Sequence, residues 1–224
     1  MYKRQVYNAN GLMNVAELVN GGKTDINITL DKNIDLTGKD WTPIGTDYDN
    51  SYTGTFDGGG HTITGLTVTT NDEYAGLFGY LGNFGNAAST VKNVVMEGIQ
   101  ITCNHRLGYA GGVAGFSWGT IENCSVSGSV SGTKCVGGVV GAQKAGSITG
   151  CSSSATVKGT VDVGGVAGEK WGTMTACYAT GNVTLEIDSP KNLSGGGLVG
   201  FNGGSSVLAC YATGNVTSTG SSTG

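Results

Sequence analysis

The sequence predicts an all-β protein: a right-handed parallel β-helix (solenoid) of about seven coils with an N-terminal capping helix. Three observations predict this fold. A glycine-rich motif returns five times, a short strand carrying cysteine or valine follows each copy, and 42 of the 224 residues are glycine. The equivalent glycines lie 36, 26, 27 and 32 residues apart. Because the motifs persist while the spacing varies, the extra residues belong in loops between fixed strands.

Residues 10–22 are predicted to form the one helix of the chain. Asn10 can cap its start, Gly21 can end it, and its apolar residues share one face. We expect this helix to cover the apolar end and the unpaired strand edge of the first coil. Residues 1–9 are interpreted as a leader. Its first five residues fit nothing that follows and resemble translated adaptor sequence.

The rest of the chain is predicted to be one continuous stack of coils. Residues 23–75 form the N-terminal coils, residues 76–217 form five repeats of the same β-helix, and residues 218–224 form a flexible tail. Short strands separated by glycine turns suit coils stacked about 4.8 Å apart. We expect the sequence to be a fragment of a longer protein with further domains, so the missing signal peptide does not bear on location.

Two positions of the repeat are predicted to form ladders inside the stack. The first is always aliphatic, in Leu77, Val113, Val139, Val166 and Leu198. The second is Val94 in the first copy and then Cys124, Cys151, Cys177 and Cys210. A position that accepts Val or Cys behaves as a small buried hydrophobe, and side chains that run side by side have poor disulfide geometry. We therefore predict buried, reduced thiols in this row and leave Cys103 and Cys135 open.

The composition excludes several functions. Charged residues make up 12% of the chain and the net charge is −4, so nucleic acid is not an expected partner. No apolar run is long enough to span a membrane. The sequence contains no His-Glu-x-x-His zinc helix, Gly-x-Ser-x-Gly nucleophile or phosphate-binding loop. We therefore predict no catalytic residues and no cofactor.

Four aromatic residues are the candidate ligand-binding residues. Trp118 and Trp171 each lie six residues before a ladder cysteine, where the intervening coil has Ala145. Tyr178 and Tyr211 directly follow ladder cysteines, so they should point outward and stack. Two explanations stay open: the rings cover glycine-rich backbone, or they form a strip that binds sugars or proteins.

A metal site is not predicted, and the weak candidates are Asp47, Asp49 and Asn50 in one polar loop. They are weak because the loop lacks the glycine of an EF-hand. A carbohydrate-active enzyme on a β-helix would need paired carboxylates, and no stack of acidic residues recurs in the repeats.

The paired motifs at residues 196–202 and 210–216 resemble the GLUG motif of bacterial cell-surface proteins. The segments at 35–45 and 56–63 resemble what precedes that motif in immunoglobulin A1-specific peptidase-like proteins and Bacteroides-type adhesins. The resemblance implies a secreted, surface-attached β-helix without catalysis. We expect an extracellular or cell-surface binding or spacer module of an adhesin-like protein, contacting glycans or surface proteins. The alternatives are a carbohydrate-active enzyme, the accessory repeats of a secreted peptidase, and a purely mechanical stalk.

Overall fold

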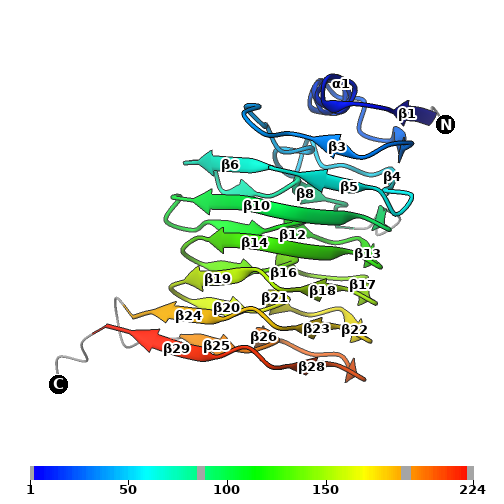
Figure 1. The fold of residues 1–224 in the computed structure, drawn as a ribbon. Coiled ribbons are helices and arrows are strands. Elements are labelled where there is room, and N and C mark those ends of the chain that lie inside the picture. Colours follow the sequence, from blue (N-terminus) through cyan, green and yellow to red (C-terminus); the bar gives the residue numbers. More distant parts are fainter. Residues whose placement is uncertain (1–2, 85–88, 188–192, 221–224) are drawn as a thin grey trace.

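The computed structural model describes residues 3–84, 89–187 and 193–220 and contains strands stacked along one axis, with a helix at the N-terminal end (Figure 1). Every strand pairing is parallel, and each strand pairs with its equivalent in the neighbouring turns. The chain is thus a parallel β-solenoid that is nearly all β, as predicted.

Two large sheets, A and B, run along the stack. Sheet A contains β1 (Lys3–Val6), β2 (Asn27–Leu30), β4 (Thr55–Asp57), β9 (Thr90–Lys92), β13 (Thr120–Glu122), β17 (Ser147–Thr149), β22 (Thr173–Thr175) and β27 (Val207–Leu208). Sheet B contains β3 (Ile34–Asp35), β5 (Thr62–Thr64), β6 (Thr67–Thr70), β10 (Val95–Cys103), β14 (Ser125–Ser131), β18 (Ser152–Ser153), β19 (Thr156–Gly159), β23 (Tyr178–Ala179), β24 (Val183–Glu186), β28 (Tyr211–Ala212) and β29 (Val216–Thr219).

Two smaller sheets, C and D, complete each turn. Sheet D contains β7 (Tyr74–Ala75), β11 (Tyr109–Gly111), β15 (Cys135–Gly137), β20 (Asp162–Gly164) and β25 (Ser194–Gly196). Sheet C contains β8 (Phe78–Leu81), β12 (Ala114–Ser117), β16 (Val140–Gln143), β21 (Ala167–Lys170) and β26 (Val199–Asn202). The chain therefore passes through sheets A, B, D and C in that order and then returns to A.

The solenoid has about six turns, so the prediction of about seven was slightly too high. The last strands, β27, β28 and β29, belong to a turn for which no strand of sheet C or D is present among the described residues.

The N-terminal end is covered by α1 (Ala9–Asn20) and β1. The helix begins after Asn8, whose side chain accepts a hydrogen bond from the Gly11 amide at 2.9 Å, so Asn8 and not Asn10 is the cap. Its apolar residues are buried: Leu12, Val15, Ala16 and Val19. β1 pairs with β2 and buries Val6, so the segment interpreted as a leader contributes a strand to the fold. Three polar residues precede Val6, so β1 has little apolar signal of its own.

The aliphatic row runs through the core beside the turn between sheets D and C. The Val113 amide donates to the Val139 carbonyl at 2.9 Å, and the Val139 amide donates to the Val166 carbonyl at the same distance. Leu77 and these three valines are buried, whereas Leu198 is half-buried. Among the described residues, Leu198 lies in the last turn that has strands of sheets C and D, and none of them is an equivalent residue on its outer side.

The cysteine row lies between sheets A and B. Cys124, Cys151 and Cys177 are buried, and Cys210, in the last turn, is half-buried. Each thiol donates to the carbonyl two residues before it, at distances of 3.1 to 3.4 Å. All six cysteines of the chain are free, and Cys103 and Cys135 are also buried.

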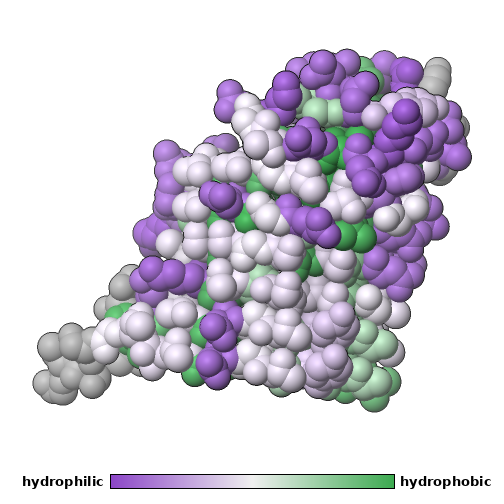
Figure 2. Space-filling view, viewed as in Figure 1, coloured by the Kyte–Doolittle hydropathy of each residue, from purple (hydrophilic) through white to green (hydrophobic). Residues whose placement is uncertain are grey.

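The C-terminal end leaves apolar side chains exposed. Val207, Leu208 and Val216 are all exposed on the last turn. The tail predicted at 218–224 overlaps β29, and residues 221–224 lie outside the described residues. On the face shown in Figure 2, over sheet B, most side chains have intermediate hydropathy and hydrophilic ones gather near the N-terminal end.

Candidate functional site

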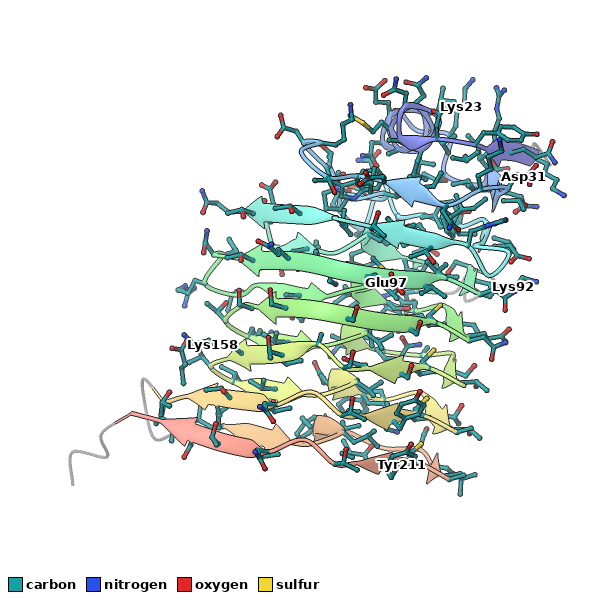
Figure 3. All side chains as sticks on the ribbon, in the orientation of Figure 1. Lys23, Asp31, Lys92, Glu97, Lys158 and Tyr211 are labelled. Carbon is teal, nitrogen blue, oxygen red and sulfur yellow. The ribbon has the colours of Figure 1, made fainter. Side chains whose placement is uncertain are left out.

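Tyr178 and Tyr211 lie on the outer face of sheet B, because each follows a cysteine that points into the core. They are paired residues of β23 and β28, and their rings stack 5.2 Å apart with 5° between the planes. The exposed fractions are 39% and 56%. Tyr211 is labelled on the last turn in Figure 3. These two parallel rings form a small flat apolar patch on the outer surface of sheet B.

Trp118 and Trp171 lie in one register, directly after strands β12 and β21 of sheet C. Trp118 is half-buried: it donates from Nε1 to the Tyr80 hydroxyl at 3.0 Å and packs against Phe116, with ring centroids 6.3 Å apart. Trp171 is 44% exposed. The two indoles therefore have different surroundings, although they occupy equivalent positions.

The residue between the two tryptophans is Lys144, not Ala145. The Lys144 amide donates to the Ser117 carbonyl at 2.8 Å, and the Trp171 amide donates to the Gln143 carbonyl at 2.8 Å. The intervening turn carries one extra residue before its next glycine, so counting back from the cysteine selected the wrong position. The Lys144 ammonium lies 5.8 Å from the centroid of Trp171. A lysine, and not a small side chain, therefore lies between the two tryptophans.

Sheets C and D approach each other on their outer sides and form a second feature, which we call the C–D cleft. At its base the main chains are so close that a Cβ on Gly141 would lie 2.4 Å from the Gly115 carbonyl oxygen and 2.8 Å from that of Cys135. The recurrent glycines permit this approach. Further out, one residue of each sheet faces the cleft in every turn: Tyr74 and Tyr80, Tyr109 and Phe116, Cys135 and Ala142, Asp162 and Glu169, Ser194 and Phe201.

The first two pairs fill the cleft with rings, and we call this part the aromatic half. Tyr80 and Phe116 stack with centroids 4.7 Å apart, and Tyr74 and Tyr109 stack at 5.5 Å. Across the cleft, Tyr109 meets Phe116 edge to face at 5.2 Å. Three of the four rings are buried, and Tyr74 is partly buried, so this half is a small external hydrophobic cluster.

The remaining pairs form the polar half, which holds charged side chains. Glu169, only 8% exposed, forms an ion pair with Lys144 and accepts a hydrogen bond from Trp171 Nε1. The Cys135 thiol lies 3.6 Å from Glu169 Oε2 and 3.8 Å from Asp162 Oδ2. On the neighbouring turn, Lys134 Nζ donates to the Tyr109 hydroxyl at 2.7 Å and so joins the two halves.

The carboxyl groups of Asp162 and Glu169 have pKa values shifted in opposite directions. Burial raises the pKa of Asp162, and the charge of Glu169 raises it further. Burial also acts to raise the pKa of Glu169, but hydrogen bonds from Lys144 and Trp171 outweigh it and the net shift is downward. Burial and the two carboxylates raise the pKa of the Cys135 thiol. This thiol is therefore a protonated donor and not a nucleophilic thiolate.

The weak metal candidates Asp47, Asp49 and Asn50 are held together by hydrogen bonds within their own loop. Asp47 Oδ1 accepts from the Asp49 and Asn50 amides at 3.0 and 2.9 Å, and its other oxygen accepts from Thr46. Burial acts to raise the pKa of Asp47, but these bonds lower it overall. This pattern is typical of an aspartate-stabilised turn.

A different group brings possible metal ligands together: one ligand atom each of Cys135, Asp162 and Glu169 lies within 4.8 Å of the others. Two nearby ammonium groups, on Lys134 and Lys144, offset the charges of the two carboxylates. A cation would have to compete with them, so the polar half does not favour a metal ion.

Sequence reasoning missed the C–D cleft, although one signal could have revealed part of it. The residue after the last glycine of each motif is Tyr80, Phe116, Ala142, Glu169 and Phe201 in turn. This position is aromatic, small or acidic in different copies, whereas the residue before it is glycine in every copy. Variation at one position of a regular repeat marks a surface that the fold itself does not constrain.

Comparison with known proteins supports the repeat assignment. The GLUG motif matches residues 107–131, 132–158 and 192–217. Halomucin of Haloquadratum walsbyi is 40% identical over 123 residues, which are 50% of this chain and 1% of that protein. The "Putative Gly-rich membrane protein" of Evansella cellulosilytica is 36% identical over 100 residues, which are 44% of this chain and 11% of that protein. The chain thus spans only a small part of these curated relatives.

A solved structure shares the fold over nearly the whole chain. It is the crystal structure of a "putative immunoglobulin A1 protease" from Bacteroides ovatus, with a TM-score of 0.75 and 24% identity. The match covers 96% of this chain and 67% of that one. Among the described residues, no helix is both long enough and apolar enough to cross a membrane. With three GLUG motifs matched and its strands in register, the chain carries GLUG repeats and folds as a parallel β-solenoid.

Proposed function

We propose that the chain is a non-catalytic, extracellular binding module of an adhesin-like surface protein, contacting glycans or surface proteins. The observation that carries this proposal is the exposure of Trp171 and Tyr178. Both lie in a turn that has neighbours on either side, yet 44% and 39% of their surfaces remain in contact with water. Large aromatic groups held at the surface of a rigid scaffold are typical of recognition sites. The names of two relatives, "Halomucin" and "Putative Gly-rich membrane protein", agree with a surface role.

A carbohydrate-active enzyme is the second candidate, and the facing pair Asp162 and Glu169 is the one observation that favours it. A retaining glycosidase places two carboxyl groups about 5 Å apart, one as acid and one as nucleophile. Here Glu169 Oε1 is held by Lys144 and Trp171, and Oε2 faces the Cys135 thiol. A carboxylate with both oxygens occupied is poorly placed to attack a sugar, so we favour binding.

The test is a binding screen of the 224-residue chain against a broad glycan array and a panel of surface proteins, followed by tryptophan fluorescence titration of each hit. We expect weak binding that the double variant Trp171→Ala/Tyr178→Ala abolishes, with the melting temperature within a few degrees of the wild type. Tyr7→Ala is the matched control, because Tyr7 is also half-exposed but lies at the N-terminal end. Cleavage of any glycan would favour the enzyme, and a complete lack of ligands would leave a mechanical spacer.

A further inference from the structure

We propose that the polar half of the C–D cleft binds one pyranose residue of a neutral glycan, an inference that rests on the binding function proposed above. The site is lined by Lys134, Lys144, Asp162, Glu169, Ser194 and Phe201. None of the four candidate residues named from the sequence is part of this lining. The argument depends on three properties of the site: where the cleft is open, how its charges balance, and which hydrogen-bonding groups face it.

The cleft is open only beyond the aromatic half. Rings fill it at Tyr109 and Phe116, and the next pair, Cys135 and Ala142, is small and buried. The following pairs then leave a hollow between β20, β21, β25 and β26. The aromatic half therefore closes one end of the site.

The charges of the site balance. Asp162 and Glu169 contribute two carboxylates, and Lys134 and Lys144 contribute two ammonium groups from the adjacent turn. An anionic ligand would be repelled by the carboxylates, and a cationic ligand would be repelled by the ammonium groups. Repulsion between like charges at short range would weaken the binding of either ligand. A neutral ligand that both donates and accepts hydrogen bonds avoids this cost. Vicinal hydroxyl groups of a sugar have this property.

The partners available to a sugar differ in how firmly they are held. Glu169 is fixed by Lys144 and Trp171, so it supports the geometry of the site. Asp162 is half-buried, and it accepts hydrogen bonds from the Ser194 side chain and from the thiol of Cys135, a weak donor at 3.8 Å. Because each carboxylate oxygen can accept more than one hydrogen bond, Asp162 can also accept from adjacent hydroxyls of a sugar. Such charge-assisted bonds are stronger than neutral ones.

Phe201 supplies the apolar surface that a pyranose ring needs. Its ring is 40% exposed and packs at a tilt against Trp171, with centroids 6.1 Å apart. The C–H face of a sugar can rest on this ring while its hydroxyls reach Asp162 and Lys134. A protein partner would need a broader apolar patch with an uncharged centre. The single ring among four charged groups fits a small polar ligand better.

The experiment measures affinity of the whole chain for soluble tetrasaccharides of glucose, mannose, galactose and xylose by isothermal titration calorimetry. Asp162→Asn keeps the shape of the side chain but removes its charge, and Phe201→Ala removes the ring. We expect each to weaken binding of the best tetrasaccharide about tenfold or more. Tyr7→Ala is the matched control, because Tyr7 is also an exposed aromatic residue but lies at the N-terminal end. Tyr211→Ala is added to test the stacked tyrosines of sheet B. Circular dichroism and melting temperature verify folding.

The outcomes separate this inference from the function on which it rests. Loss of binding in Tyr211→Ala with full binding in Asp162→Asn and Phe201→Ala would place the site on sheet B; the inference would then be wrong and the binding function would stand. Binding that disappears with EDTA, or that requires an anionic sugar in a parallel titration, would also overturn it. If no tetrasaccharide binds but the screen yields a protein ligand, the inference fails and the module remains a binder. If neither binds, both proposals fail.

Discussion

The two halves of the C–D cleft share one backbone plan but differ in what they do. In the aromatic half, Tyr80, Tyr109 and Phe116 exclude water and add a hydrophobic cluster outside the main core. In the polar half, the same positions carry Asp162, Glu169 and Phe201, and the cleft is open. Because the strand pairing is the same in both, the repeat maintains the fold while its outward positions are free to serve either stability or binding.

The largest expected effect tests whether the aromatic half contributes stability. Phe116→Ala removes a ring that contacts Tyr80, Tyr109 and Trp118, so we expect the free energy of unfolding to fall by about 3 kcal/mol in urea denaturation. The matched control is Tyr211→Ala, an exposed ring that should cost less than about 0.5 kcal/mol. Equal costs for both variants would contradict the difference between the two halves.

A smaller effect is expected from the ion pair of the polar half. Glu169→Gln leaves the Lys144 ammonium, whose side chain is 24% exposed, without its partner, and should cost about 1–2 kcal/mol at neutral pH. Because the folded pKa of Glu169 is lowered, its contribution is present above its ordinary value of 4.5 and is lost as the pH falls through the folded pKa. The cost should therefore disappear in acid. Glu186→Gln, which breaks the exposed pair with Lys158, is the control and should have almost no effect at any pH.

The smallest expected effect is a gain in the free energy of unfolding instead of a loss. The pKa of Asp162 is raised in the folded state, so the folded state holds this proton more tightly than the unfolded chain does. The charged carboxylate therefore weakens stability as the pH rises above the ordinary pKa of 3.8. Asp162→Asn should therefore be slightly more stable than the wild type at pH 7, and the advantage should shrink towards pH 3. Urea denaturation at both pH values measures this. A variant that is less stable at pH 7 would show that the carboxylate is already well paired in the free protein.

The fold could be predicted because its determinants recur in the sequence. Aliphatic residues such as Val113 and Val139 return in step with the glycines, and a parallel stack is the arrangement that brings them together. The capping helix was also visible from the periodicity that buries Leu12 and Val19. The number of turns was less certain, because the sequence does not mark where a turn is incomplete.

The candidate site was less predictable, since it depends on contacts between segments. The residue equivalent to Trp118 and Trp171 is Lys144 instead of the predicted Ala145, because one inserted residue shifts the register of this turn. Only the main-chain hydrogen bonds reveal such a shift. The cleft arises from the close approach of two sheets at glycines such as Gly141, which leaves no local trace beyond the glycine itself. Asp162 and Glu169 are seven residues apart and face each other only because the chain reverses between β20 and β21.

The row of thiols provides a way to follow how the solenoid unfolds turn by turn. A solenoid loses turns from an end, since each turn contacts only its neighbours. Cys210 is half-buried on the outermost turn, and Cys177, Cys151 and Cys124 follow inward, each one turn deeper. A thiol reagent should therefore label these four in that order as the C-terminal end frays, and the mass of the labelled chain would count how many turns have opened. Each buried thiol of the core thus marks the position of one turn along the solenoid axis.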